Sequence, residues 1–448
     1  MSSSSSFRTL RTRAQSGIEA QIQHAKTFAQ QTVLDVLSGN EGLMFTTAAK
    51  LCGAPVATEV SEEPQQSTIP ERRHDRPLRI LSLDGGGVRG YSALLILRDI
   101  MARVQDVEGS ENPILPADYF DLIIGTSTGG IMALMLGRLR MTIDECLEAY
   151  RTLAQKAFSA GIFLNTINAC STMIKAGGPS IYNEEKLEKC IKRTIGAHTD
   201  GGHDDILLHE PSPDACRTAV VTALSADATR PILLRSYLPG DPRLRTVKVW
   251  EAARATSAAP LFFKPVAIGP EKVSYVDGAV TGHCNPTALA LEEVEKLWPD
   301  REIGLLLSLG TGSPSKIPLQ GQAHQILQAL VNLSTTTVRT HEDTFRTFDR
   351  LYAVSPYVRF TVDYHIEKIR LDDYSSLPKL AEDTFAYLQK VSHEVQHCVD
   401  LATGTLQPRL KSMEDLKSTF STFSKGLGSR THAPEYSQPA PPYTASAS

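Results

Sequence analysis

The chain has 448 residues, of which 41% are hydrophobic and 21% charged, a balance typical of a globular protein with a sizeable core. Its net charge of -4 excludes the strongly basic surface of nucleic-acid-binding proteins, so no nucleic-acid partner is expected. Seven scattered cysteines without a Cys-x-x-Cys pair favour reduced thiols in an intracellular compartment over a disulfide framework or a zinc site.

The first 76 residues are expected to form an extension ahead of the globular part. Apolar side chains at helical spacing predict a helix over residues 17–39, and a polar stretch from Ser61 to Arg76 is interpreted as a linker. The Ser-rich start, with three arginines between Arg8 and Arg13, favours a disordered basic tail and would also fit a mitochondrial targeting signal. Since no run is long and apolar enough to cross a bilayer, the expected location is cytoplasmic.

After the linker, short apolar runs alternate with helical patterns. A strand is predicted at Leu78–Leu83, followed by a glycine cluster and a helix through Leu94–Val104. A second strand, Tyr119–Ile124, leads into a tight turn at Gly125–Gly130 and a helix over Ile131–Arg138. The alternation predicts an α/β fold with three layers, α/β/α, around a mostly parallel central sheet. Ligands of such sheets bind at the carboxyl ends of the strands.

The later part of the chain continues this alternation and then becomes mainly helical. Further strands are predicted at Ala219–Leu224, Ile232–Leu234, Val273–Val276 and Ile303–Leu309. A helical pattern covers Pro286–Trp298, and residues 322–350 and 376–403 also predict helices, with a strand at Tyr357–Tyr364 between them. The Ser/Thr/Pro/Gly-rich end, residues 424–448, is predicted to be disordered.

The segment Gly125-Thr126-Ser127-Thr128-Gly129 places a serine between two glycines, after a predicted strand and before a predicted helix. This is the arrangement of a nucleophile elbow, in which a sharp turn exposes the serine hydroxyl at the sheet edge, near the positive end of a helix. A side chain at either flanking glycine would clash with the neighbouring strand and helix. The pattern favours Ser127 as a nucleophile, with a plain Gly/Ser turn as the alternative.

The segment DGGGVRG, residues 84–90, also lies between a predicted strand and a predicted helix. Adjacent glycines let consecutive backbone N–H groups converge on one anion, here the oxyanion of a tetrahedral acyl intermediate, and Arg89 adds positive charge. Three of these glycines also fit the GxGxxG pattern of dinucleotide-binding loops. That alternative is weaker, because the expected acid about twenty residues on should end a second strand, whereas Asp106 and Glu108 lie at the end of a helical pattern.

An acidic residue stands at the end of a third strand. Asp277-Gly278-Ala279 follows the apolar run Val273–Val276, which is a placement typical of active sites in α/β folds. A surface Asp-Gly turn is the alternative for this segment alone. His283, six residues further on, leaves a Ser-His-Asp triad open as a competitor, whereas His203 and His209 lie in a polar loop and are expected to be solvated.

DGGGVRG, GTSTGG and VDGA, in this order, resemble the motifs of the patatin-like phospholipase family of lipid acyl hydrolases. The similarity extends from about Leu78 to Gly312 and includes VWEAARATSAAP at 249–260, while Phe120–Arg138 resembles the fungal members. The resemblance implies a patatin-like catalytic domain over residues 77–315, with residues 316–423 packed on it as a mainly helical part.

By this resemblance Ser127 is the nucleophile and Asp277 its base in a Ser-Asp dyad that forms an acyl-enzyme. The oxyanion hole is assigned to Gly85, Gly86, Gly87 and Arg89. The remaining motif positions are Asp84, Gly90, Gly125, Gly129, Gly278 and Ala279. No metal and no cofactor is expected, so activity should be independent of calcium.

Two positions depart from the family pattern. Ala279 stands where many members have glycine, and Cys284 precedes Asn285-Pro286 where the family often has two asparagines. The second departure leaves the local hydrogen bonding open.

The implied substrate is a fatty acyl ester of a phospholipid or related glycerolipid, met at a membrane or micelle surface by a peripherally associated enzyme. A free aspartate, with a pKa of about 3.9, is a poor base, so burial should raise the pKa of Asp277. A scaffold protein that retained the fold without turnover is the remaining alternative. The helix over residues 17–39 would either pack on the catalytic domain or lie at the lipid interface.

Overall fold

The computed structural model describes residues 76–158, 182–237, 242–260, 262–312, 337–362 and 369–412, which all belong to one compact unit, Pro70–Ser448. The predicted helix at 17–39, the basic start and the tail at 424–448 lie outside the described residues. Among the helices that are described, none is long and apolar enough to span a bilayer. The five cysteines in these ranges are buried.

An eight-stranded sheet forms the centre of the molecule, in the order β5-β6-β3-β2-β1-β7-β9, with β4 paired to β3. The strands are β1 Leu78–Leu83, β2 Leu122–Thr126, β3 Arg217–Leu224, β4 Pro231–Arg235, β5 Val266–Ile268, β6 Val273–Asp277, β7 Ile303–Leu309 and β9 Tyr357–Phe360. The run from β3 through β2, β1 and β7 to β9 is parallel throughout, whereas β4 and β6 are antiparallel to β3. The predicted α/β class with a mostly parallel sheet is confirmed.

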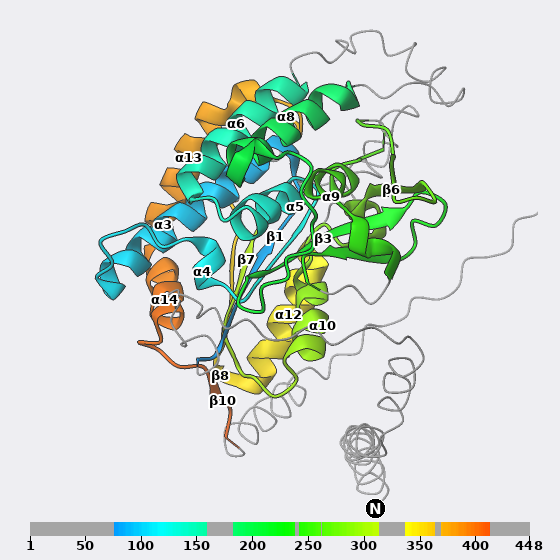
Figure 1. Cartoon of the computed structure of the whole chain (residues 1–448). Coiled ribbons are helices and arrows are strands. Elements are labelled where there is room, and N and C mark those ends of the chain that lie inside the picture. The colour runs from blue at the N-terminus through cyan, green and yellow to red at the C-terminus, as the bar shows by residue number, and fades with distance from the viewer. Residues whose placement is uncertain are drawn as a thin grey trace, which may run out of the picture. The chain divides into compact units, whose positions relative to one another are not determined.

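Helices cover both faces of this sheet (Figure 1). One face carries α3 Gly90–Glu108, α5 Thr128–Ala133, α6 Ile143–Phe158, α8 Glu184–Ala197, α9 Val249–Thr256, α13 Leu377–Lys390 and α14 Ser392–Thr403. The other carries α10 Thr287–Leu297 and α12 Val338–Leu351. A small ribbon of β8 Tyr352–Val354 and β10 Arg409–Leu410 is separate from the main sheet.

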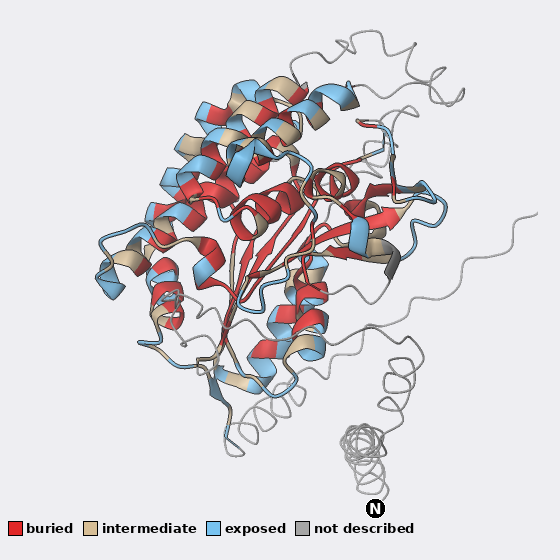
Figure 2. Cartoon of the chain, in the orientation of Figure 1, coloured by how far each residue is buried: buried red, intermediate tan, exposed pale blue. Residues whose placement is uncertain are grey.

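The strands divide their side chains between two cores by simple alternation. In β1, Leu81 and Leu83 contribute to the larger core, which the helices around α3 close, while Leu78 and Ile80 contribute to the smaller core under α10 and α12. Successive side chains of a strand point to opposite faces, so a strand buried on both faces is apolar at nearly every position. Figure 2 shows the buried strands between the inner faces of the two helix layers.

Some predicted boundaries are wrong. The second strand begins at Leu122 rather than Tyr119, because Pro116 starts a one-turn helix, α4 Pro116–Tyr119, in which Tyr119 is buried. The helix predicted over 376–403 is two helices, α13 and α14, with a break at Val391, and the described part of the 322–350 prediction is α12. The helix predicted from Ile131 begins earlier as α5 and continues as a π-helical turn, Leu134–Arg138.

Strand β3 brings together two chain segments that are far apart in the sequence. Strand β4 occupies one edge of β3 through Ala223, so β6 must lie on the same edge as β2. Along that edge Thr126, the last residue of β2, pairs with Val221, and Asp277, the last residue of β6, pairs with Thr222. The carboxyl ends of β2 and β6 therefore meet at adjacent residues of β3.

Candidate active site

Ser127 occupies a strained turn between β2 and α5. Its backbone has φ 56° and ψ -127°, a conformation that side-chain-bearing residues rarely adopt. A Cβ at Gly125 would overlap the carbonyl oxygen of Gly129, and a Cβ at Gly129 would overlap that of Leu83. Both flanking positions therefore require glycine. The Ser127 N–H donates to Thr256 Oγ1 over 2.9 Å, which fixes the turn from α9.

Asp277 is the last residue of β6 and is almost fully buried, with 1% of its surface exposed. Burial is the largest influence on its carboxyl group and raises the pKa to about 7, against the opposing effect of hydrogen bonds from the Ser127 side chain and the Ala279 N–H. The Ala279 N–H lies 2.8 Å from Oδ1. A carboxyl group that has a pKa near neutrality and lies beside a serine hydroxyl is suited to accept the hydroxyl proton.

The loop that follows β1 contains Gly85, Gly86 and Gly87 and lies beside Ser127. Hydrogen bonds fix it: the Gly85 N–H donates to Cys284 O over 3.0 Å, and Thr311 Oγ1 donates to Gly85 O over 2.6 Å. Gly87 adopts φ +56°, and a Cβ there would overlap the Leu371 carbonyl. The loop therefore has a single backbone course that only glycine allows.

Two backbone donors of this loop have no acceptor among the residues that the structure describes. They are the N–H groups of Gly86 and Gly87, and both residues line the pocket described next. The N–H of Gly85, by contrast, is committed to Cys284. The Arg89 N–H donates to Gly86 O over 3.2 Å, and the largely buried Arg89 does not line the pocket. Within this loop, the donors available for a substrate oxygen are therefore those of Gly86 and Gly87.

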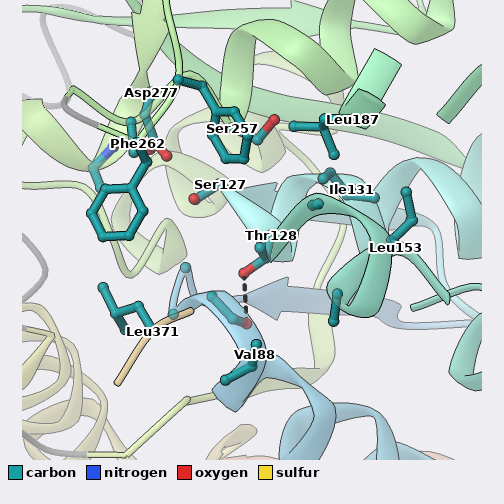
Figure 3. A pocket seen from close by; sticks show the side chains of 18 of the residues that line it. Val88, Ser127, Thr128, Ile131, Leu153, Leu187, Ser257, Phe262, Asp277 and Leu371 are labelled. Atoms are coloured by element: carbon teal, nitrogen blue, oxygen red, sulfur yellow. Dashed lines mark hydrogen bonds between the residues drawn. The ribbon is translucent and has the colours of Figure 1, made fainter. Parts of the chain in front are cut away.

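A pocket opens beside these groups. The cavity volume is about 120 Å³, and one water molecule needs roughly 10–15 Å³ of such volume. Figure 3 shows Ile131, Leu153 and Leu187 on one side of it and Ser127 with Asp277 on the other. Its further lining side chains are mostly apolar as well: Val88, Ala154, Ala157, Ala259, Pro260, Phe262, Phe263, Val280 and Leu371. Such a lining suits a hydrocarbon chain.

His283 takes a different place from that of a triad histidine. Its Nδ1 lies 2.8 Å from Thr281 Oγ1, its carbonyl accepts from Thr126 Oγ1 over 2.7 Å, and it does not line the pocket. Asp277 instead contacts Ser127 directly. His209 is also away from the pocket, with Nδ1 3.2 Å from Ser236 O.

Several site residues were not anticipated from the sequence. Thr256 lies within the VWEAARATSAAP stretch, which was the one available signal for it. Tyr150 of α6 donates its hydroxyl to Gly87 O, and Thr128 Oγ1 donates to the same carbonyl over 3.3 Å. Arg359 of β9 lies far from every motif in the sequence, yet it forms an ion pair with Asp84. No local pattern marks Tyr150 or Arg359, because their partners are supplied by the fold.

Several known proteins are similar in sequence to this chain. The family model described as patatin-like phospholipase matches residues 81–291. Calcium-independent phospholipase A2-gamma of Oryctolagus cuniculus is 29% identical over 331 residues, 72% of this chain and 39% of that protein. Patatin-like protein 1 of Arabidopsis thaliana is 32% identical over 53% of this chain and 59% of that protein. The cGAMP-activated phospholipase of Escherichia coli (strain TW11681) is 32% identical over 49% and 57%.

Among solved structures, VipD from Legionella pneumophila is matched with a TM-score of 0.32 and 13% identity, over 69% of this chain and 67% of that chain. This chain spans about two fifths of the length of the phospholipase A2-gamma proteins that it matches. The family-model match and these relatives identify residues 81–291 of this chain as a patatin-like phospholipase domain.

Proposed function

We propose that this protein is a serine lipid acyl hydrolase that cleaves fatty acyl esters of phospholipids or related glycerolipids. One observation carries the proposal: the Ser127 side chain interacts with the buried carboxyl of Asp277, and both residues line an apolar pocket. Relatives named as calcium-independent phospholipase A2-gamma and cGAMP-activated phospholipase support the substrate class.

The first chemical step is attack by Ser127 Oγ on the ester carbonyl carbon. The hydroxyl proton moves to the Asp277 carboxylate, and the carbonyl oxygen becomes an oxyanion. The N–H groups of Gly86 and Gly87 are the available donors for that oxygen, and such preorganised donors supply the larger share of stabilisation. The elbow strain holds the nucleophile in place, so little reorganisation accompanies the attack.

Collapse of the tetrahedral intermediate breaks the ester C–O bond. Asp277 returns its proton to the leaving alcohol, and the acyl group stays on Ser127. Water then gives a proton to Asp277 and attacks the acyl carbon. The second tetrahedral intermediate releases the fatty acid and Ser127 recovers its proton from Asp277, which restores the starting state.

The apolar pocket supports a lipid ester as the substrate. The side chains of Ile131, Leu153 and Leu187 offer hydrocarbon contacts for an acyl chain whose carbonyl lies at Ser127. Burying each CH₂ group of that chain is worth about 0.8 kcal/mol. We expect the enzyme to take such substrates at a membrane or micelle surface, as a peripherally associated protein.

Fluorophosphonate labelling tests the nucleophile. The wild-type protein should form one covalent adduct on Ser127, found by peptide mass spectrometry, and Ser127→Ala should neither be labelled nor hydrolyse esters. A defined phospholipid panel, with products identified by mass spectrometry, then gives the acyl position. A folded wild-type protein that is neither labelled nor active on any ester would instead support the scaffold alternative.

A further inference from the structure

The glycine loop depends on an ion pair with the last strand of the sheet. Asp84, the residue that precedes Gly85, is fully buried, and its carboxylate contacts the guanidinium of Arg359 on β9. Arg359 NH2 lies 2.6 Å from Oδ2, and NH1 lies 3.3 Å from Oδ1. The Arg359 side chain is only 4% exposed. A two-point contact of this kind fixes direction as well as distance.

Further polar groups hold the guanidinium itself. Ser308 Oγ, at the end of β7, accepts from Arg359 NH1 over 2.6 Å, and Thr337 Oγ1, beside α12, accepts from NH2 over 3.0 Å. Thr287 Oγ1 donates to Ser308 Oγ over 3.1 Å and in turn lies 2.9 Å from Ser82 Oγ on β1. Arg359 is therefore tied to β1, β7 and the start of α12 at once.

Such anchoring matters because the loop has no side chains with which to hold itself, so its course depends on the hydrogen bonds of its backbone and on its neighbour Asp84. Three consecutive glycines lose more backbone entropy on ordering than any other residues, and they have no side chains with which to pack. The catalytic donors of the proposed mechanism, the N–H groups of Gly86 and Gly87, are directly downstream of Asp84. An error of about 1 Å in such donors costs about 10²-fold in rate.

We propose that Arg359 is a positioning residue for the oxyanion-binding loop, acting through Asp84. The inference rests on the proposed hydrolase function and adds to it a residue that lies outside the segment matched by the family model, residues 81–291. Its consequence is that β9, in the C-terminal part of the chain, is a component of the catalytic machinery.

The pair Arg235–Glu293 offers a matched control. Arg235 of β4 donates to the buried Glu293 of α10 over 2.6 and 2.7 Å, so it is a comparable two-point ion pair. Neither residue lines the pocket. Glu293→Gln should lower the melting temperature without changing kcat, because it weakens packing between a strand and a helix away from the glycine loop.

Arg359→Lys keeps the charge but cannot make the two-point contact. On a soluble short-chain ester we expect kcat to fall about 10²-fold with KM within about threefold of wild type. Asp84→Asn combined with Arg359→Gln leaves no unpaired buried charge, so it should recover stability relative to Asp84→Asn alone while kcat stays low. This double variant carries the test if Arg359→Lys does not fold.

A second readout is independent of turnover. In the Ser127→Ala background, amide hydrogen exchange of the peptide covering residues 84–90 should be faster in Arg359→Lys than in its parent. Unchanged kcat and unchanged exchange in folded Arg359→Lys would overturn the inference, as would an equal kcat loss in Glu293→Gln at equal melting temperature. If the wild type proves inactive, the exchange result still decides the role of Arg359 in ordering the loop.

Discussion

Two buried aspartates stand at the ends of β1 and β6, and both are followed by glycine, yet their surroundings differ. Asp84 is 0% exposed and faces the guanidinium of Arg359, whereas Asp277 is 1% exposed and has the neutral hydroxyl of Ser127 as its side-chain partner. Burial raises the pKa of both carboxyl groups, but at Asp84 the Arg359 cation opposes that rise, whereas at Asp277 only a hydroxyl and a backbone N–H oppose it. In the proposed mechanism, the same dipeptide thus gives a structural anchor in one place and a proton acceptor in the other.

The largest expected effect concerns turnover. Asp277→Asn should lower kcat by about 10²–10⁴-fold on a soluble ester, because a general base contributes that much and an amide cannot accept the proton. Steady-state kinetics with active-site labelling as a folding control measures it. A folded Asp277→Asn enzyme with most of its activity would remove Asp277 from the proton-acceptor role.

Replacing either aspartate by asparagine should change the free energy of unfolding, but in opposite directions. Asp84→Asn leaves the Arg359 cation buried without its counter-charge and should cost about 3–5 kcal/mol in the free energy of unfolding. Asp277→Asn should be stabilising at pH 8, by at most about 4 kcal/mol, because it removes an ionised group whose pKa is raised to about 7. Denaturant unfolding at pH 8 compares them, and a loss of stability in both would contradict the distinction.

The pH dependence of the rate tests the ionisation of Asp277 directly. Asp277 must be deprotonated to accept the serine proton, so kcat/KM should rise with pH and level off above a midpoint near 7. Folding stability should change the opposite way, because the folded state holds the proton between the ordinary pKa near 4 and about 7 and loses that advantage as the pH rises. A rate midpoint near 4 would show that burial does not raise this pKa.

The smallest expected effect is that of His283→Ala. The ring of His283 contacts Thr281 rather than Asp277, so we expect kcat to stay within about fivefold of wild type. Its kcat is best measured beside that of Asp277→Asn on the same substrate. A loss as large as that variant's would restore the Ser-His-Asp alternative and end the contrast between the two aspartates.

The sequence predicts what depends on neighbours in the chain. The alternation of apolar runs predicts the sheet, and the glycines around Ser127 predict an elbow, because the steric cause lies within five residues. The partner of Asp84 could not be predicted, since Arg359 lies 275 residues away and no spacing rule links them. The commitment of the Gly85 N–H to Cys284 was likewise hidden, because it depends on where the chain after β6 passes the loop.

Strand β3 sets the positions of Ser127 and Asp277 relative to each other. Ser127 and Asp277 are set by the pairing of β2 and β6 with the adjacent residues Val221 and Thr222, so the connections between these strands could lengthen or shorten without moving either group. The exposed turn at 225–230 is one such place for insertions. One residue added inside β3 would instead change the register and turn its side chains to the opposite face. Variation in length should therefore be found outside β3 and not within it.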